Sequence, residues 1–149
     1  MTTDIAAPSG LELLRALGSH LDAVPNIGRL LGMQVDRVDE GEVVMSLETR
    51  PDFSNPLGSV HGGVCATLLD SVMACAVHTT LEPGVGYSTL EIKVNYIATV
   101  PTTGVRLTAT GRTVHVGRTT ATAEGSVYDE DGRLIAHGTT TCLILRGRA

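Results

Sequence analysis

The feature of this sequence that most restricts its fold is the stretch 64–81, which is apolar on nearly every side when drawn as a helix. Its main apolar positions are Val64, Leu68, Leu69, Val72, Met73, Ala76 and Val77. A helix of this kind is normally enclosed by the rest of the chain, whereas a surface helix keeps one polar face. Pro83 and Gly84 follow it and end it. The stretch therefore predicts one long central helix against which the other elements pack.

Much of the remaining chain has the two-residue period of β-strands. The apolar positions of the clearest example are Leu90, Ile92, Val94 and Tyr96. They alternate with polar residues, as expected for a strand with one buried and one exposed face. Alternation also begins after Met33. Further strands are expected at 43–48, 105–116, 119–128 and 134–145. The connections are short and lack helices, so neighbouring strands are expected to be antiparallel, with a hairpin turn at 129–132.

The beginning of the chain predicts a separate short helix. Ser9 and Glu12 have the spacing of a capping box, and leucines follow at the helical positions 11, 14, 17 and 21. Pro25 ends this helix, and 27–31 predicts one or two more helical turns. The elements together predict an α+β fold, an antiparallel sheet of five or six strands packed against one long helix. We expect a single domain over 1–149, with a helical extension at 1–32 and a core at 33–149.

The composition argues against several classes of function. The 149 residues carry a formal net charge of −5 and include one Phe, three Tyr and no Trp, whereas nucleic-acid binding favours a basic surface or aromatic stacking platforms. No apolar run approaches the roughly 20 residues of a membrane helix. Cys65, Cys75 and Cys142 are spaced too irregularly for a disulfide framework or a tetrahedral zinc site. We therefore expect a cytoplasmic protein that binds no nucleic acid, membrane or metal.

Asp70 is the first candidate for a chemical role. It is the only formally charged residue between Asp52 and Glu82, and its neighbours one helical turn away are all uncharged. No local cation neutralises it, and burying an unpaired carboxylate is costly. An isolated acid in an apolar helix is therefore a candidate catalytic group. The alternative is that Asp70 reaches the helix surface or pairs with a distant arginine.

The segment before the central helix holds the other candidates. Gly62 and Gly63 at a helix start leave backbone N–H groups free, and a carbonyl oxygen can approach them closely, as an oxyanion hole requires. A tight turn would use the same glycines. His61 is nine residues from Asp70, on nearly the opposite side of a helix, so we expect it to bond to the backbone and hold the turn. Asn55 is expected to orient a water molecule or to form the turn.

Residues 55–70, NPLGSVHGGVCATLLD, resemble the signature of hotdog-fold acyl-CoA thioesterases of the phenylacetate-pathway (PaaI-like) type. Weaker resemblance continues through the residues Val94-Asn95-Tyr96 and the turn Gly117-Arg118-Thr119. The resemblance implies the hotdog fold, in which a sheet wraps around one central helix. The extension before Met33 lies outside this resemblance.

The resemblance also implies roles for individual residues. Asp70 would be the general base or nucleophile, and the N–H of Gly62 would polarise the thioester carbonyl. Asn55 would help to hold that carbonyl or the attacking water, and Thr89 would assist the water unless the adjacent Ser88 takes its place. Arg118 suits a phosphate of coenzyme A, which arrives with the substrate and is the only cofactor-like group implied. The residues implied to bind coenzyme A are Tyr96, His115, Val116, Gly117, Arg118, Thr119 and Thr120.

The spacing of the two main groups predicts how the chains assemble. Gly62 and Asp70 are eight residues apart, about 12 Å along a helix. One carbonyl cannot lie within about 3 Å of both groups of the same chain. We therefore expect a homodimer, or a dimer of dimers, in which each site combines Asp70 of one subunit with Gly62 of the other.

Two other functions fit the same residues. A hotdog dehydratase or hydratase uses a His base opposite a carboxylate, which His61 could supply only with help from a partner subunit. A non-catalytic module would bind acyl-CoA without hydrolysing it. In all three cases the scarcity of aromatic residues indicates an aliphatic acyl pocket, which we expect Met73, Val77 and Leu90 to line.

Overall fold

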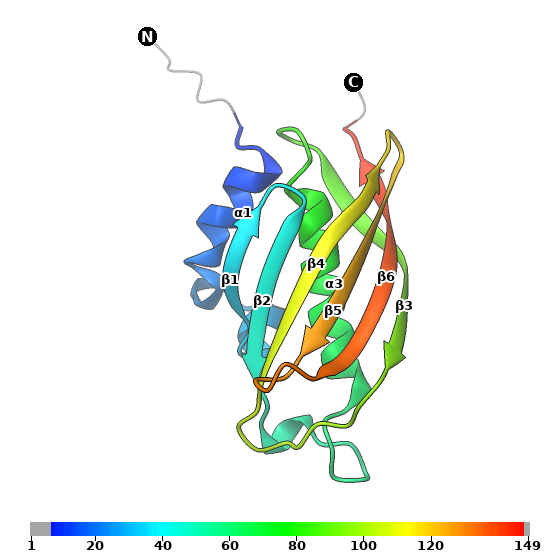
Figure 1. Cartoon of the computed structure of the whole chain (residues 1–149). Helices are drawn as coiled ribbons and strands as arrows, with labels where there is room; N and C mark the ends of the chain where they lie inside the picture. The colour runs from blue at the N-terminus through cyan, green and yellow to red at the C-terminus, as the bar shows by residue number, and fades with distance from the viewer. Residues whose placement is uncertain (1–6, 148–149) are drawn as a thin grey trace.

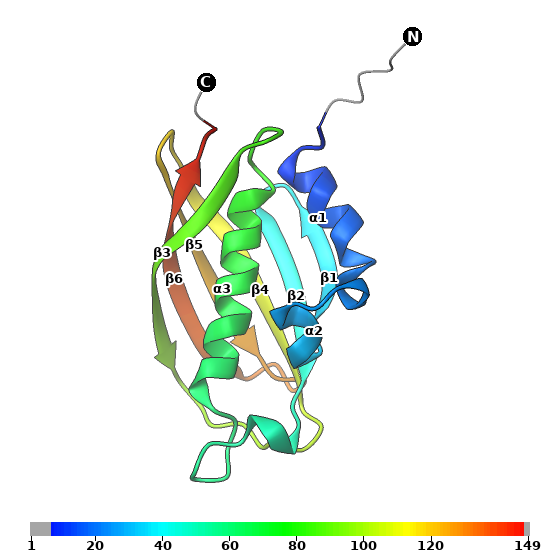
Figure 2. The same ribbon diagram turned by 180° about the vertical axis from the view of Figure 1, so that it is seen from behind.

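The long helix α3 (Gly62–His78) packs against one face of a six-stranded antiparallel sheet. The computed structural model describes residues 7–147, so the first six residues of the predicted extension lie outside it. The sheet curves around α3, and the N-terminal helices lie beside α3 near the β1 edge of the sheet (Figures 1 and 2). The helices before α3 are α1 (Gly10–Gly18) and α2 (Ile27–Leu31), with short 3-10 turns η1 (Leu21–Ala23) and η2 (Pro51–Phe53). The predicted α+β arrangement around one central helix is confirmed.

The order of the strands differs in one respect from the expectation. The strands are β1 (Gln34–Asp39), β2 (Glu42–Glu48), β3 (Gly86–Tyr96), β4 (Arg106–Val116), β5 (Thr120–Tyr128) and β6 (Leu134–Leu145). They lie in the order β1-β2-β4-β5-β6-β3. The prediction that strands joined by short connections are neighbours is therefore wrong for β3 and β4, because β3 pairs with β6 at the edge of the sheet. The alternation after Met33 belongs to two strands, joined at Gly41 with its positive φ of 77°.

Two glycines in the middle of the sheet, Gly111 and Gly125, let α3 lie close to it. Gly111 of β4 is paired with Gly125 of β5, and Gly125 is paired with Gly138 of β6. A Cβ added to Gly111 would lie 2.4 Å from the backbone carbonyl carbon and oxygen of Val72, in the middle of α3. Real Cβ atoms do not approach backbone so closely, so the packing of α3 depends on the absence of a side chain at Gly111.

The helix α3 is less enclosed than its sequence predicts. Its apolar residues are buried against the sheet, and Leu68, Leu69, Val72 and Met73 have no exposed surface. A stripe of small and polar side chains on the opposite face is only half-buried: Thr67, Asp70, Ser71, Cys75 and His78. Asp70 therefore lies at the helix surface, which is the first of the two alternatives to a sequestered acid. Met73 and Val77 are fully buried in the core, so the prediction that they line an acyl pocket is wrong.

The N-terminal helix α1 is fixed to α3 at its first residue. The predicted capping box is present, since Ser9 accepts from the N–H of Glu12 and the Glu12 carboxylate accepts from the N–H of Ser9. Gly10 donates its N–H to the carbonyl of Leu81 at 3.1 Å. A Cβ on Gly10 would lie 1.8 Å from the carbonyl oxygen of His78, so only glycine permits this contact. The α-helix ends at Gly18, earlier than the leucine spacing predicts, and Leu21 begins a separate turn.

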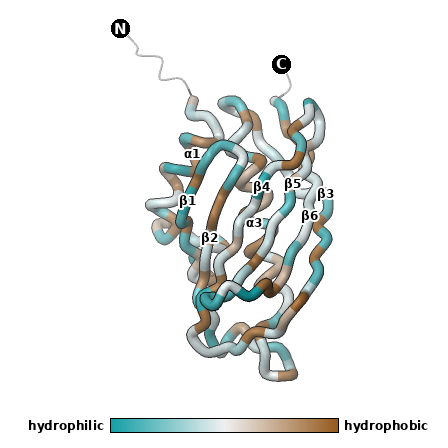
Figure 3. The backbone as a smooth tube through the Cα atoms, in the orientation of Figure 1, coloured by the Kyte–Doolittle hydropathy of each residue, from teal (hydrophilic) through white to brown (hydrophobic). Residues whose placement is uncertain are grey.

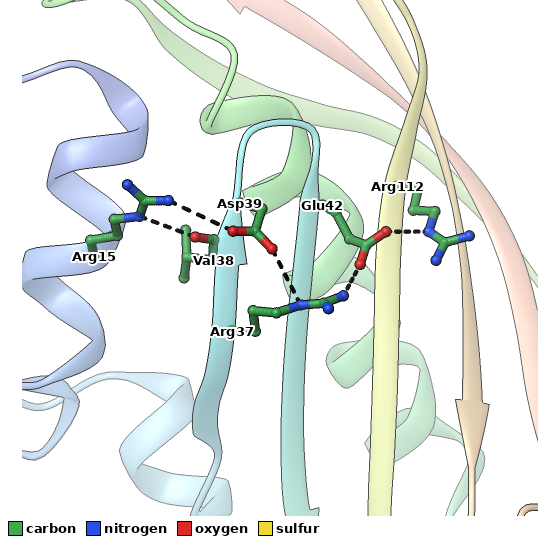
Figure 4. A network of polar contacts seen from close by, with 6 residues as sticks. All are labelled: Arg15, Arg37, Val38, Asp39, Glu42 and Arg112. Atoms are coloured by element: carbon green, nitrogen blue, oxygen red, sulfur yellow. Dashed lines mark hydrogen bonds and ion pairs between the residues drawn. The ribbon is translucent and has the colours of Figure 1, made fainter.

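A chain of ion pairs ties the middle of α1 to the sheet (Figure 4). Arg15 of α1 donates to the carbonyl of Val38 at 3.1 Å and lies 3.7 Å from Asp39 of β1. Arg37 bridges Asp39 to Glu42 of β2, and Glu42 also pairs with Arg112 of β4. These side chains are mostly exposed, so each pair contributes little free energy. They therefore position α1 beside β1 without adding much to the strength of its attachment.

The hydropathy of each element matches how deeply that element is buried in the fold. In Figure 3 the strand β2 is strongly hydrophobic over much of its length, and Val43, Met45 and Leu47 of this strand are buried. The helix α1 alternates between hydrophobic and hydrophilic residues, as expected for a helix with one packed face. Within residues 7–147 no helix is both long and apolar enough to cross a membrane.

Candidate active site

Thr89, a residue of strand β3, holds the side chain of Asp70 in place. The Thr89 hydroxyl donates to Oδ1 of Asp70 at 2.9 Å, and both residues are half-buried. In the part of the chain that the structure describes, no group donates to the other carboxylate oxygen, Oδ2, and Asp70 has no ion pair. One oxygen of Asp70 is thus fixed and the other is left for a further partner.

A β-bulge explains why Thr89, and not Ser88, contacts Asp70. The register of β3 against β6 shifts between Thr89 and Glu91, which leaves Leu90 as an extra residue. The bulge places Thr89 on the same inner face as Ile92, whereas Leu90 is turned outward and is 55% exposed. The prediction that Leu90 shares the buried face with Ile92 is therefore wrong, whereas its place in an acyl pocket stays a prediction.

His61 caps the N-terminus of α3, as predicted. Its Nδ1 accepts the N–H of Gly63 at 2.9 Å, and its carbonyl accepts the N–H of Val64 at 2.9 Å. Tyr96, at the end of β3, donates its hydroxyl to the carbonyl of Gly62 at 2.9 Å. The peptide between Gly62 and Gly63 is therefore held at both its C=O and its N–H. Among residues 7–147 nothing accepts the N–H of Gly62, which is free for a ligand at the positive end of the helix.

The capping role of His61 predicts the behaviour of two variants. His61→Ala removes the cap and should lower the free energy of unfolding by about 0.5–2 kcal/mol. His61→Asn supplies another capping side chain and should regain most of that loss. Urea denaturation of the two variants measures both effects. If His61→Asn is as unstable as His61→Ala, the contact with the N–H of Gly63 is not what stabilises the start of the helix.

Asn55 forms the turn in front of α3. Its Oδ1 accepts the N–H groups of Leu57 and Ser59, and its Nδ2 donates to the hydroxyl of Ser59 at 3.0 Å. The backbone closes the same loop, because the N–H of Asn55 donates to the carbonyl of Ser59. Asn55 thus has the turn-forming role that the sequence allowed, with its side-chain groups bonded within its own loop.

The residues expected to bind coenzyme A fall into two places. His115 to Thr120 cover the end of β4, a tight turn and the start of β5, and are largely exposed. Thr120 and Ser88 are both paired with Leu143, so this segment is level with Thr89, about 10 Å away across two strand spacings. Tyr96 lies seven residues further along β3, about 23 Å from that level. One subunit therefore does not bring Tyr96 and the 115–120 turn together.

An apolar cavity on the exposed side of α3 is a feature that the sequence-based predictions do not include. Ser71 and Cys75, which follow Asp70, line a cavity of about 290 Å³ against the N-terminal helices. Burial raises the pKa of the Cys75 thiol to about 11, so it is uncharged near neutral pH. The signal was available, because Thr67, Ser71, Cys75 and His78 are small or polar residues at helical spacing in an otherwise apolar helix. Among the described residues, no three His, Cys, Asp or Glu side chains gather as a metal site.

Comparison with known proteins agrees with the fold. The Thioesterase superfamily profile matches residues 57–136. A 1,4-dihydroxy-2-naphthoyl-CoA hydrolase of Listeria monocytogenes is 28% identical over 79% of this chain and 94% of its own length. Human acyl-coenzyme A thioesterase 13 is 26% identical over 87% of this chain and 93% of its own. The Escherichia coli PaaI protein of the phenylacetic acid degradation operon shares the fold with a TM-score of 0.80 at 20% identity, covering 92% of this chain and 97% of its own.

A central helix in a curved antiparallel sheet is the hotdog fold, and the match to the Thioesterase superfamily with relatives named as thioester hydrolases gives the class of protein. The match to the Thioesterase superfamily, over residues 57–136, covers more than half of the sequence. The chain belongs to the Thioesterase superfamily. It is of the PaaI-like type, since a phenylacetic acid degradation-related protein of Ralstonia eutropha is 30% identical and covers 87% of this chain and 98% of its own, with a TM-score of 0.77.

Proposed function

We propose that this protein hydrolyses an acyl-CoA thioester to the free acid and coenzyme A, with Asp70 as its general base or nucleophile. The observation that carries the proposal is the contact between Thr89 and one oxygen of Asp70. It orients the carboxylate and leaves Oδ2 to attack the thioester carbonyl or to take a proton from a water molecule. Thr89 is then a positioning residue rather than the group that reacts.

The N–H of Gly62 is proposed as the donor that stabilises the oxyanion. It lies at the start of a 17-residue helix, where the dipole favours negative charge. The contacts of Tyr96 and His61 on either side of the following peptide support this role, because a donor that is already oriented needs no rearrangement during the reaction. A donor of this kind contributes about 10²–10³-fold in rate.

The two groups are proposed to meet across two subunits. The eight residues that separate Gly62 from Asp70 span about 12 Å of helix, too far for both to contact one carbonyl. The 115–120 turn is level with Thr89, whereas Gly62 and Tyr96 are at the other end of β3. A homodimer, or a dimer of dimers, in which Asp70 and Thr89 of one subunit face Gly62 of the other satisfies both constraints.

Coenzyme A is proposed to bind along the 115–120 turn. Arg118 is exposed and its carbonyl accepts from Arg146 at 3.3 Å, which places a second guanidinium beside the turn. Arginine matches phosphate oxygens in geometry and charge. The thiol of coenzyme A leaves readily, because an ordinary thiol has a pKa near 8.5. The proposed reaction therefore needs no strong acid and no cofactor other than the coenzyme A of the substrate.

Mixing two inactive variants tests the shared site. Asp70→Asn and Gly62→Val should each be inactive alone. In a refolded equal mixture, half of the dimers are mixed, and each mixed dimer has one intact site of its two. About a quarter of the wild-type activity should therefore return, measured as release of free thiol from acyl-CoA.

Native mass spectrometry of the mixture is the control for that experiment. Mixed dimers that form and remain inactive would contradict sharing of the site between subunits.

The two alternative functions have their own tests. If an enoyl-CoA is hydrated and no thiol is released, the hydratase alternative replaces the proposal. His61 argues against that alternative, because its Nδ1 is already bonded to Gly63. Tight acyl-CoA binding without turnover would instead indicate a binding module.

A further inference from the structure

We propose that the N-terminal helices set the length of the acyl group, because they close an apolar cavity beside Asp70 that fits a straight aliphatic chain. This inference rests on the proposed function and names the acyl class of its substrate. The helices concerned, α1, η1 and α2, lie before the region that matches the Thioesterase superfamily, residues 57–136.

The cavity lies between these helices and the exposed side of α3. Its volume is about 290 Å³, and its apolar lining comes from Leu17, Leu21, Val24, Ile27, Met33 and Met45. A second cavity of about 340 Å³ shares Leu17, Leu21, Met45 and Cys75 with the first and continues toward His78. The two adjoining cavities form an apolar space that runs along α3. Volumes of this size lie near the lower end of ligand pockets.

The cavity begins close to the reacting group. Ser71 is the residue after Asp70, and Cys75 is five residues after it, about 7.5 Å along the helix axis. An acyl chain whose carbonyl carbon is at Asp70 can therefore enter between Ser71 and the N-terminal helices. The coenzyme A part of the same substrate would extend away from the cavity, toward the 115–120 turn.

Two polar residues at the cavity, Asn26 and His20, are already bonded elsewhere, which leaves Ser71 and Cys75. Asn26 caps α2 by accepting the N–H of Arg29, and its Nδ2 donates to the carbonyls of Leu21 and Val24, each at 2.8 Å. Nδ1 of His20 lies within hydrogen-bond distance of the Ser19 hydroxyl and the Ala16 carbonyl. These contacts leave few groups to recognise a polar ligand, whereas a hydrocarbon needs none.

The apolar lining is open to a ligand. Leu17 is 46% exposed, Val24 is 58% exposed and Ile27 is 52% exposed, which is unusual for large apolar side chains that lie close together. The apolar lining of the first cavity consists of Leu, Met, Val and Ile residues without Phe, Tyr or Trp, and the second cavity has one such aromatic residue, Tyr87. The Leu and Met side chains adapt to a flexible alkyl chain. An aromatic ring would gain more from a flat pocket with aromatic walls.

A series of acyl-CoA substrates with straight chains from two to sixteen carbons, together with phenylacetyl-CoA, tests the inference. We expect kcat/KM to rise about 3- to 4-fold for each added methylene until the cavity is filled. Phenylacetyl-CoA should be slower than the best straight-chain substrate. A flat profile, or a preference for phenylacetyl-CoA, would overturn the inference and leave the proposed hydrolysis standing.

Two tryptophan variants on α2 provide a matched pair. Ile27→Trp fills the cavity and should lower kcat/KM for the best substrate at least about tenfold, while butyryl-CoA changes by less than about twofold. Leu30→Trp is the control, because Leu30 is 63% exposed and does not line the cavity. Equal effects of the two variants on the chain-length profile would contradict the inference.

Decanoate binding provides a readout that does not depend on catalysis. Calorimetry should detect decanoate binding to the wild-type protein with a negative heat-capacity change, its loss in Ile27→Trp and its retention in Leu30→Trp. Decanoate binding by a protein that hydrolyses no thioester would support the cavity and contradict the proposed function. Dissociation of the oligomer by Ile27→Trp alone would show that a second copy of the chain occupies the cavity, which overturns the inference.

Discussion

Asp70→Asn is expected to lower kcat for acyl-CoA hydrolysis by about 10²–10⁴-fold, with a much smaller change in KM. Asparagine keeps the size of the side chain and can still accept from the Thr89 hydroxyl. It cannot take a proton or attack a carbonyl as a carboxylate does, so the loss should equal the contribution of a general base. Because Asp70 is half-buried and has no ion partner in the described structure, the fold should tolerate the change. The measurement is steady-state thiol release, with circular dichroism to verify folding.

Thr89 provides the control for the role of Asp70. Thr89→Ser keeps the hydroxyl and should remain within about threefold of the wild-type kcat. Thr89→Val removes the hydrogen bond, worth about 1.5–3 kcal/mol when the acceptor is charged, and should lower kcat without abolishing it. Full activity of Asp70→Asn would remove Asp70 from the mechanism, and an equal loss in Ser and Val variants would indicate that the shape of Thr89 matters more than its hydroxyl.

Gly111→Ala is expected to destabilise the fold strongly, by about 3 kcal/mol or more, although it adds only one methyl group. The new Cβ would lie 2.4 Å from the backbone of Val72. Neither the helix nor strand β4 can yield locally, since both are in the buried centre of the domain, and overpacking of this kind costs about 1–3 kcal/mol even where side chains can move. The melting temperature should fall by about 6–12 °C.

Gly86→Ala is the matched control for that prediction. Gly86 also lies in a strand, but its nearest neighbour would be 3.8 Å from an added Cβ, an ordinary contact distance. Thermal denaturation of the two variants should therefore give a large shift for Gly111 and a small one for Gly86. Similar shifts would mean that the loss reflects the replacement of strand glycine in general rather than the approach of α3.

The sequence predicted the elements well because their patterns are local. Strand β6 is predicted at 134–145 and is observed at Leu134–Leu145, since a run rich in Leu, Ile and Thr directly after a turn is recognised without knowledge of distant residues. The pairing of β3 with β6 was not predicted, because it joins residues some fifty positions apart. Nothing in the sequence marks which strand closes the edge of a sheet.

The sequence indicates which residues are candidates for the site, but it does not predict how they are arranged. Asp70 stood out because it is charged in an apolar helix, and Thr89 was indicated by a family resemblance. The choice between Thr89 and Ser88 depended on a bulge at Leu90, which strict alternation cannot reveal. The contact between Tyr96 and Gly62 also has no local signal, because it joins the end of β3 to the start of α3.

The thin attachment of the N-terminal helices has a consequence for how they behave in solution. Between residues 10 and 31 only Gly10 and Gly28 are buried, so this segment contributes little apolar area to the core. Regions with few buried contacts open at a lower free-energy cost than the whole domain unfolds. Residues 10–31 should therefore separate from α3 and return as a unit while the sheet stays intact. This local opening would give a long ligand a route into and out of the cavity that the intact sheet and α3 do not offer.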